Sequence, residues 1–336
     1  MNTRSLGSDG LKVSALGLGC MGMSGAYGPS DEAESIATVH ASLDAGINLL
    51  DTGDFYGMGH NEMLLQKALD GHRREDVVIS VKFGALRGPA NEFGGVDARP
   101  AAVKNFLAYS LKRLGTDYID IYRAARLDPA VPIEDTIGAI AEMVEKGYVR
   151  RIGLSEVGAE TIRRAQAVHP ICDLQIEYAI ITRGIEDEIL PICRELGIGI
   201  TAYGVLSRGL ISGHWSKDTS IQSGDFRGFS PRFQGENIDR NLSLVDELRA
   251  IADAKGASVA QVAIAWVLSR GEDIVPLVGA RTRGRLTEAL GALDVNLTPD
   301  DIAQIERAVP IGAAAGDRYP TAMMAHLDSE RKHTTS

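Results

Sequence analysis

Short runs of β-branched and apolar residues alternate with longer segments of helical periodicity from residue 11 almost to residue 310. The runs predicted to be strands cover residues 15–19, 48–52, 77–83, 118–124, 151–155, 174–178, 199–203 and 274–278. Amphipathic helices are predicted between them, among others at residues 32–45, 101–114, 133–146, 186–196 and 259–269. Because right-handed crossovers bring each strand beside the previous one, eight such units close into a parallel (β/α)8 barrel with the helices outside.

Local signals at the ends of the predicted helices agree with this pattern. Ser258 stands three residues before Gln261 and forms a capping box, and Thr298 followed by Pro299 is an N-cap with proline at the first helical position. Five helical segments are followed by a glycine, as expected where a helix ends in a left-handed residue: Gly46, Gly115, Gly147, Gly197 and Gly271.

A doubly wound dinucleotide-binding fold is the main alternative, because residues 17–22 read GLGCMG and match the G-x-G-x-x-G fingerprint. In that fingerprint the third glycine packs inside the first turn of a helix. Here Gly25, Gly28 and Pro29 follow, so no helix begins before about Ser30. The barrel is therefore favoured over the dinucleotide-binding fold.

At roughly 150 residues per domain, 336 residues suggest two domains, but α/β barrels routinely exceed 250 residues as one unit. We predict one barrel at residues 1–310 and a C-terminal tail at residues 311–336, with the last eight residues disordered. Residues 204–237, after the seventh strand, are rich in Gly, Ser and aromatic residues. This stretch is too long for a routine connection, which predicts a functional loop.

The charge balance favours a small-molecule ligand. The chain has 35 Lys and Arg against 45 Asp and Glu, a net charge of −10, which argues against nucleic acid or an anionic membrane as a partner. The three cysteines form no disulfide framework, and no signal peptide or membrane span is evident. We expect a soluble cytoplasmic protein; the sequence predicts no metal site and does not constrain the oligomeric state.

Three polar residues are expected to meet where the strands of a barrel end at their carboxyl side. Asp51 ends the second predicted strand, Tyr56 follows in the loop, and Lys82 ends the third strand. An isolated Asp–Lys pair is equally well explained as a structural ion pair. A tyrosine beside the ammonium changes this, because a nearby cation lowers the phenol pKa from its usual value of about 10 and makes the group a usable acid and base. Protonation of a carbonyl oxygen as hydride arrives needs such a group.

At these residues the sequence resembles the aldo-keto reductases. Residues 51–57 read DTGDFYG, and further blocks follow in the family's order: 59–62 (GHNE), 153–156 (GLSE), 174–178 (LQIEY), 201–204 (TAYG), 225–227 (DFR), 231–233 (PRF) and 260–266 (AQVAIAW). The resemblance covers nearly the whole chain. It implies a (β/α)8 barrel that binds a nicotinamide cofactor, with Asp51, Tyr56 and Lys82 as catalytic residues.

One member of the family's catalytic tetrad is missing. Residues 118–129 read YIDIYRAARLDP, which puts Ala125 where the family has a histidine. The loss of an imidazole enlarges the pocket beside Tyr56 and favours bulky carbonyl substrates. Arg123 has the strand parity of Ala125 and is expected to be an ion-paired barrel arginine rather than a site residue.

The resemblance also assigns the binding residues. The cofactor is expected to contact Gly22, Met23, Asp51, Ser155, Gln175, Tyr203, Gly204, Leu206, Ser207, Arg208, Gly209, Lys217, Gly279, Ala280, Arg281, Arg285 and Glu288. Ser155 and Gln175 would hold the nicotinamide amide, together with Glu156 as a weaker contact, and Tyr203 would stack on the ring. The residues expected to line the substrate site are Tyr27, Phe83, Ala125, Arg126, Trp215 and Phe229.

The expected cofactor is NADPH. Arg281, Arg283 and Arg285 fall within five residues of an acidic chain, where the family binds the adenosine phosphate at the start of a helix. This concentration of positive charge favours the 2′-phosphate of NADPH over NADH.

Two other functions fit parts of the sequence. A Schiff-base aldolase would use Lys82 as its nucleophile, but it gives Tyr56 and the arginines no role. A regulatory protein would bind NADPH and turn over little, which the missing histidine makes worth testing. Reversible NADPH-dependent reduction of a ketone or aldehyde remains the favoured prediction.

Overall fold

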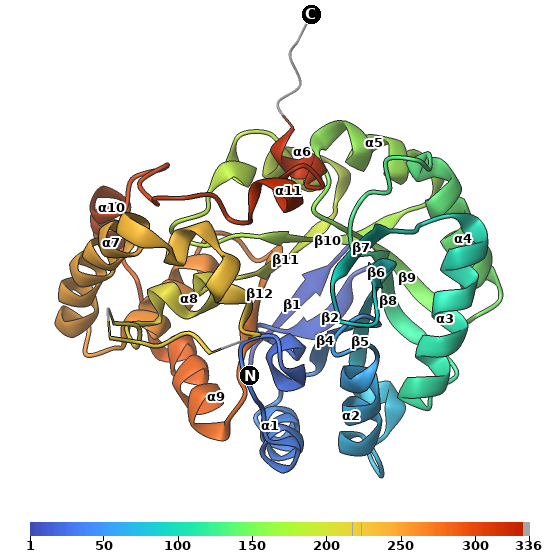
Figure 1. Cartoon of the computed structure of the whole chain (residues 1–336), viewed down its shortest axis with the longest axis horizontal. Helices are drawn as coiled ribbons and strands as arrows, with labels where there is room; N and C mark the ends of the chain where they lie inside the picture. The colour runs from blue at the N-terminus through green and yellow to red at the C-terminus, as the bar shows by residue number, and fades with distance from the viewer. Residues whose placement is uncertain (217, 223, 332–336) are drawn as a thin grey trace, which may run out of the picture.

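The computed structural model describes residues 1–216, 218–222 and 224–331. Eight parallel strands of this part of the chain form a closed barrel, and helices surround it (Figure 1). In chain order the barrel strands are β3 (Gly17–Gly19), β4 (Leu49–Gly53), β5 (Val78–Phe83), β8 (Ile119–Ala124), β9 (Val149–Ser155), β10 (Ile171–Glu177), β11 (Gly199–Tyr203) and β12 (Ile274–Gly279). The barrel prediction is confirmed, and the closed sheet excludes the doubly wound alternative.

Helices lie close to the five positions named from the sequence, 32–45, 101–114, 133–146, 186–196 and 259–269, and the described chain has further ones. The helices of the described chain are α1 (Glu32–Asp44), α2 (His60–Ala68), α3 (Pro100–Leu114), α4 (Ile133–Glu145), α5 (Ala159–Val168), α6 (Ile189–Leu196), α7 (Gly235–Ala254), α8 (Val259–Leu268), α9 (Arg283–Leu290), α10 (Pro299–Ala308) and α11 (Thr321–Met324). The capping box predicted at Ser258 and Gln261 is present, and Thr298 caps α10. The five glycines predicted after helices all have positive φ.

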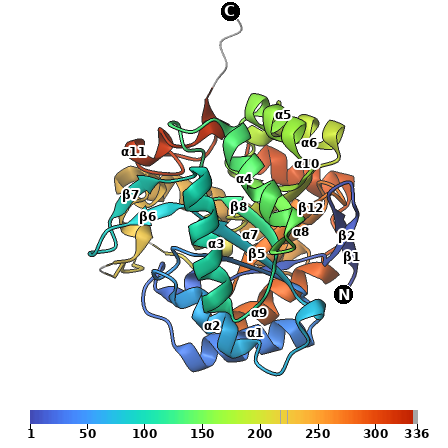
Figure 2. The ribbon, with the colours of Figure 1, turned by 90° about the vertical axis from the view of Figure 1, so that its right-hand side faces the viewer.

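Two antiparallel hairpins that the strand pattern did not reveal lie at opposite ends of the barrel. The first, β1 (Thr3–Leu6) and β2 (Leu11–Ser14), places Leu6 and Val13 in the apolar cluster inside the barrel. The second, β6 (Ala85–Arg87) and β7 (Phe93–Val96), follows β5 and lies on the same side as α11 (Figure 2). Both are short, so neither gives a strong alternation of polar and apolar residues.

Side chains separate into two cores. The large apolar cluster fills the layer between the barrel and the helices, where Phe83 stacks on Tyr122 at 4.4 Å between ring centroids. The inside of the barrel holds fewer apolar residues and several buried polar ones. In the described chain, no single helix is long and apolar enough to cross a membrane, and α7 and α8 pass that test only as a pair bent by 86°.

Candidate active site

Asp51 and Lys82 meet inside the carboxyl end of the barrel. They lie on neighbouring strands, β4 and β5, and each is 4% exposed. The Lys82 Nζ donates to Asp51 Oδ1 at 2.5 Å and to the Thr52 carbonyl oxygen at 3.1 Å. Two charges at this depth must compensate each other, so each residue fixes the position of the other. Burial lowers the pKa of Lys82 and Asp51 opposes this. With both acceptors in place, the geometry favours a fixed cation over the neutral nucleophile that an aldolase needs.

A buried hydrogen-bond network supports this ion pair from below. Asp51 Oδ2 accepts from Ser80 Oγ at 3.0 Å and from Gln175 Nε2 at 2.6 Å. Ser80 Oγ accepts in turn from Arg123 Nη2 at 2.9 Å, and Arg123 pairs with Asp173 at 3.0 Å. Arg123 and Asp173 are both fully buried, which confirms the prediction of an ion-paired barrel arginine. The network limits the positions open to Asp51 and therefore to Lys82.

Tyr56 lies in the loop after β4, above the ammonium group. The Lys82 Nζ is 5.1 Å from the centroid of the Tyr56 ring, and Phe55 packs edge-on against that ring at 4.8 Å. Within the described residues, the Tyr56 hydroxyl has no hydrogen-bond partner, so its proton is free to be donated to a ligand.

The pKa of Tyr56 differs from the sequence-based expectation. Burial raises this pKa well above its usual value, Asp51 raises it further, and Arg126 opposes the rise. The expectation that Lys82 lowers the pKa of Tyr56 is therefore wrong for this structure. The physical reason is that the Lys82 charge is balanced by Asp51, while desolvation penalises the tyrosinate. The phenol is consequently protonated at neutral pH.

Asp54, between Asp51 and Tyr56, is 9% exposed, and its Oδ2 accepts from the Gly84 N–H at 3.4 Å. Burial raises its pKa to about 7, and Glu62 adds to the rise. A carboxyl group whose pKa is higher in the folded state stabilises the fold fully below its unfolded pKa of about 4, and this stabilisation is lost as pH rises toward 7.

We therefore expect Asp54→Asn to stabilise the protein at high pH. Relative to the parent protein, the free energy of unfolding of the variant should rise by roughly 2 to 3 kcal/mol between pH 5 and pH 8, since each pH unit below the folded pKa contributes about 1.4 kcal/mol. Urea denaturation at several pH values measures this difference. The exposed Asp70 offers a control, Asp70→Asn, which should show no such trend. Parallel curves for Asp54→Asn and the parent protein would contradict the assignment.

The C-terminal segment, residues 311–331, is anchored beside the carboxyl end of the barrel. Arg318 makes a two-pronged ion pair with Glu156, at 3.0 and 2.9 Å. The neighbouring Tyr319 hydroxyl lies 2.9 Å from the Tyr203 hydroxyl, which donates to Glu156 Oε1 at 2.6 Å. Burial alone would raise the pKa of Glu156, but Arg318 overrides this and the pKa lies below its usual range.

Two further contacts fasten the end of this segment. Asp328 Oδ2 accepts from Gly158 N at 2.9 Å and from Thr161 Oγ1 at 2.7 Å, which caps the start of α5. Ser329 Oγ donates to Glu156 at 2.6 Å, and a 3-10 turn, η8, covers Asp328–Glu330. Of the last eight residues, which the sequence predicts to be disordered, 329–331 are placed here and Ser329 is hydrogen-bonded; residues 332–336 lie outside the described part.

The expected nicotinamide contacts fall at the ends of β9 and β10. Ser155 pairs in register with Gln175, and the buried Ser155 hydroxyl has no partner among the described residues. A buried hydroxyl without a partner fits a site for a polar ligand such as a carboxamide. Gln175 already donates to Asp51, so it links the two positions. Glu156 is a correction: its carboxylate is taken up by Arg318 and Ser329 and is not free for a cofactor.

The loop predicted to wrap the pyrophosphate has an unusual backbone. Ser207, Arg208 and Gly209 have φ values of 48°, 60° and 93°, within the 3-10 segment η4 (Ser207–Ser212). Left-handed backbone in non-glycine residues carries strain and is common where a ligand is held. The buried Ser207 hydroxyl also lacks a partner within the described chain. Gly204 precedes the loop with φ 66°, and a Cβ there would lie 3.0 Å from Glu177.

The arginines expected at the adenosine phosphate lie around the start of α9. Arg281 Nη1 donates to the carbonyl oxygens of Tyr27 and Pro29, at 2.9 and 3.2 Å. A Cβ on Gly22 would lie 3.2 Å from the Arg281 side chain, so η1 (Met21–Ser24), with Gly22 and the buried Met23, packs against this arginine. Arg285 pairs with Glu288 at 3.0 Å.

The structure gives fewer contacts for the other residues that are expected to bind the cofactor. Glu288 also lies 2.8 Å from His214 of the long loop after β11. Gly279 ends β12 and Ala280 is buried beside it. Leu206 is partly buried against the large apolar cluster. Lys217 lies outside the described residues.

Two of the predicted substrate contacts lie away from the buried groups of the site. Phe83 points out of the barrel and packs on Tyr122 and Phe106, because alternation along β5 sends it to the face opposite Lys82. Phe229 is 70% exposed, on the short 3-10 turn η5 (Phe226–Phe229) of the long loop.

The other substrate predictions fall nearer the site. Arg126 contacts Tyr319, and Ala125 is 2% exposed. Tyr27 is partly buried, with the Arg227 guanidinium 5.5 Å from its ring centroid. Trp215 packs edge-on against Phe233 at 4.9 Å, with Arg227 stacked over its ring.

Sequence reasoning missed Arg318 and treated Tyr319 as part of a tail. Helical or strand periodicity does not reveal either residue, because the segment between α10 and α11 has no regular structure. The available signal was an arginine and a tyrosine followed by Pro320, in a stretch otherwise rich in Ala and Gly.

Comparison with known proteins agrees with the barrel fold. Residues 15–310 match the Aldo/keto reductase family. This chain belongs to that family. It is 44% identical over 316 residues to "Probable aldo-keto reductase 1" of Glycine max, covering 94% of this chain and 90% of the other. As a family member it is an oxidoreductase related to enzymes that generally use NAD(P)H and act on small carbonyl compounds.

Two solved structures resemble this reductase along nearly their whole length. A glycerol dehydrogenase from Gluconobacter oxydans is 28% identical, with a TM-score of 0.82, covering 99% of this chain and 98% of that one. The holo form of an aldo-keto reductase from Bacillus halodurans is 27% identical, with a TM-score of 0.77, covering 94% and 98%.

Proposed function

We propose that this aldo-keto reductase reversibly reduces a ketone or aldehyde to an alcohol, with NADPH as its cofactor and Tyr56 as the proton donor. The observation that carries the proposal is the stack of three groups at the barrel end. Asp51 holds Lys82 at 2.5 Å, and the Lys82 ammonium lies 5.1 Å from the centre of the Tyr56 ring. A structural ion pair alone would not need a half-buried phenol above it whose hydroxyl has no partner among the described residues.

Each of the three side chains has one task in this mechanism. Tyr56 gives its hydroxyl proton to the carbonyl oxygen as that oxygen gains negative charge. Its raised pKa keeps the proton on the phenol at neutral pH, so the transfer is driven by the charge that develops on the substrate. Lys82 stabilises the resulting tyrosinate, and Asp51 keeps the ammonium charged and directed at it.

The cofactor would be held by residues around the barrel end. When bound, NADPH supplies the hydride that reduces the carbonyl carbon. We assign the nicotinamide amide to Ser155 and Gln175, and the phosphates to residues 204–209 and to the start of α9. Within the described chain, the hydroxyls of Ser155 and Ser207 have no partner. The first supports the nicotinamide contact and the second the phosphate contact. Tyr203 is the proposed stacking partner, although Glu156 and Tyr319 engage its hydroxyl here.

We expect NADPH to bind more tightly than NADH. Arg281→Ala or Arg285→Ala should reduce the difference between the two dissociation constants. Loss of one charge-assisted contact to the 2′-phosphate costs roughly 1.5 to 3 kcal/mol, or about 10- to 150-fold in the dissociation constant. Fluorescence titration with each cofactor gives two dissociation constants for the parent protein and two for each variant.

Arg283 provides a matched control from the same loop. Its guanidinium pairs with Glu34 of α1 at 3.0 Å and is 63% exposed. Arg283→Ala should therefore leave the ratio of the NADPH and NADH constants within about twofold. Equal constants for the two cofactors in the parent protein would rule out the proposed preference.

The preferred substrates are proposed to be bulky ketones. The short side chain of Ala125 leaves the substrate to be oriented by the walls of the site rather than by a side chain at that position. The proposed reaction is reversible and therefore includes oxidation of the alcohol. The name of the Gluconobacter relative, a glycerol dehydrogenase, supports this reverse direction. We propose the cytoplasm as the compartment, supported by three free, buried cysteines.

The function is tested by following NADPH absorbance with a panel of carbonyl compounds. The panel contains a compact aldehyde, a cyclic ketone and a polycyclic ketone, and each is also offered as the alcohol with NADP⁺. Turnover with any of them supports the proposal, and a higher kcat/KM for the polycyclic ketone supports the preference for bulk. Tight NADPH binding without turnover across the panel would favour the regulatory alternative.

A further inference from the structure

Arg126 occupies a distinctive position beside the proposed active site. It directly follows Ala125, just past the end of β8. Its Nη1 donates to the Ala125 carbonyl oxygen at 2.6 Å, and its Nη2 donates to the Tyr319 hydroxyl at 3.3 Å. The side chain is partly buried, and its guanidinium lies 5.7 Å from the centroid of the Tyr319 ring. Two neutral oxygens thus hold the guanidinium in place, and the carboxylate of Glu156 acts on its charge only from beyond ion-pair distance.

The other arginines of this region are paired with carboxylates. Arg318 binds Glu156, and Arg208 and Arg232 both contact Glu177. Within the described residues, no carboxylate oxygen lies within 4 Å of the Arg126 guanidinium. A partly buried cation without an anionic partner attracts any ligand group that carries or develops negative charge.

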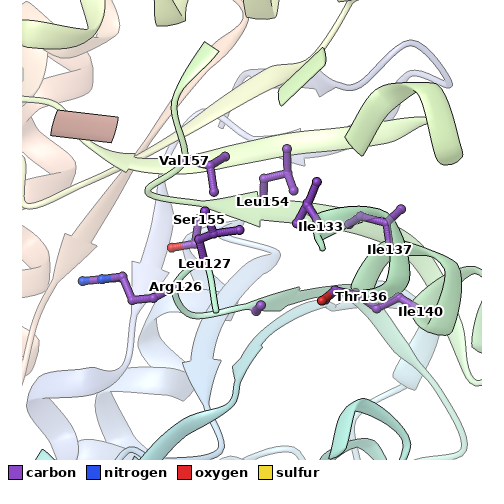
Figure 3. Close-up of a pocket in the computed structure, with 11 residues that line it drawn as sticks. Arg126, Leu127, Ile133, Thr136, Ile137, Ile140, Leu154, Ser155 and Val157 are labelled. Carbon is purple, nitrogen blue, oxygen red and sulfur yellow. The ribbon is translucent and has the colours of Figure 1, made fainter. Parts of the chain in front are cut away.

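β8 pairs in parallel with β5, so Arg126, just past the end of β8, lies at the same carboxyl end of the barrel as Lys82. Arg126 and Ser155 line the same small pocket, whose opposite wall is formed by apolar side chains of α4. Figure 3 shows the Arg126 guanidinium and the Ser155 hydroxyl directed to the same side, away from that wall. Burial raises the pKa of Tyr56 and the Arg126 charge opposes this rise, whereas burial and Arg126 both lower the pKa of Lys82.

We propose that Arg126 is a catalytic residue, which donates a hydrogen bond to the carbonyl oxygen of the substrate beside Tyr56 and stabilises the negative charge that develops there. This inference rests on the proposed carbonyl reduction. A guanidinium offers five N–H donors in a fixed plane, so Arg126 can contact a substrate oxygen while it keeps its bonds to Ala125 and Tyr319.

The step balances with this assignment. The carbonyl carbon accepts a hydride from the reduced cofactor, which is thereby oxidised, and the C=O π bond breaks as the C–H bond forms. The oxygen takes the Tyr56 proton. Arg126 transfers no proton and keeps its charge throughout; it lowers the energy of the oxygen while that atom carries excess electron density.

The test compares two phenyl ketones: acetophenone, which has a methyl group beside the carbonyl, and benzoylformate, which has a carboxylate in that place. In Arg126→Met we expect kcat to fall by about 10²- to 10³-fold for both, as for removal of one oxyanion donor. The NADPH dissociation constant and the affinity of the NADP⁺ complex for acetophenone, which involves no turnover, should change by less than about threefold. Added guanidinium salt should restore part of the kcat of Arg126→Ala, and Arg126→Lys should lie between Arg126→Met and the parent protein.

Other outcomes overturn the assignment in distinguishable ways. A loss confined to benzoylformate would make Arg126 a clamp for a substrate carboxylate, and an unchanged kcat would remove it from the site. Loss without guanidinium rescue, together with weakened NADPH binding, would indicate a structural role. Arg164→Met controls for the loss of one positive charge, because Arg164 lies on α5, is exposed and pairs with Glu134. If the parent protein reduces neither ketone nor any panel compound, the proposed function itself fails.

Discussion

Replacement of Tyr56 by phenylalanine is expected to lower kcat by roughly 10²- to 10⁴-fold, the usual cost of losing a positioned proton donor. The substitution removes one oxygen atom and keeps the edge-on ring contact with Phe55. Since this hydroxyl has no partner among the described residues, its loss breaks no internal hydrogen bond. Stability and NADPH affinity should therefore be nearly unchanged. Steady-state kinetics with the best substrate of the panel measures kcat, and a cofactor titration measures the NADPH affinity.

The matched control is Tyr109→Phe. Tyr109 lies on α3 and is 57% exposed, so this substitution removes a hydroxyl far from the barrel end. Its kcat should equal that of the parent protein. If Tyr56→Phe also kept most of its turnover, the proton would have to come from another group or from water, and the role given to Lys82 and Asp51 would fall with it.

Much of the barrel could be predicted from the sequence because its elements are encoded locally. β11 covers the residues predicted for it, and β5 differs by one residue at one end. The strands are buried on both faces and read as continuous apolar runs, while the helices between them have one apolar face. The hairpin β6–β7 escaped prediction because it is short and only partly buried, so it has no such pattern.

The site was predictable wherever the barrel topology alone determines proximity. Asp51 and Lys82 end adjacent parallel strands, so their meeting follows from the fold. The direction of the Tyr56 pKa did not follow, because it depends on how deeply the phenol is buried and on Asp51 compensating the charge of Lys82. Likewise, the sequence offered Glu156 as a cofactor contact, whereas its role depends on where the chain returns more than 150 residues later.

That return is the part of the site that the sequence could least predict. The C-terminal segment has a single turn of α-helix, and buried polar contacts rather than periodicity hold it in place. Arg318 is the central contact: it binds Glu156 and Glu330 and lies 3.4 Å from Glu177. Without it, the carboxylates of Glu156 and Glu177 would remain buried with less compensating charge.

We expect Arg318→Met to release the C-terminal segment from the barrel. Removal of one partner of a buried ion pair costs roughly 3 to 5 kcal/mol, because the remaining charge stays desolvated. The segment can detach while the barrel stays folded, and detachment returns Glu156 to water, so the cost should appear as local opening rather than as global unfolding. A change of about 3 kcal/mol corresponds to a roughly 100-fold larger open population.

Hydrogen exchange resolves this opening at particular amides. The Ala315 N–H donates to Asn241 Oδ1 at 2.8 Å and the Ser329 N–H donates to the Glu156 carbonyl oxygen at 3.2 Å, so both should lose protection in Arg318→Met. Amides of β4 and β5 should keep theirs. Arg331→Met is the matched control on the same segment, because Arg331 lies 3.6 Å from Asp328 and is half exposed, where an ion pair contributes little. Equal protection of the Ala315 and Ser329 amides in Arg318→Met and Arg331→Met would mean that the apolar contacts of Tyr319 and Leu327, rather than the buried charges, hold the segment.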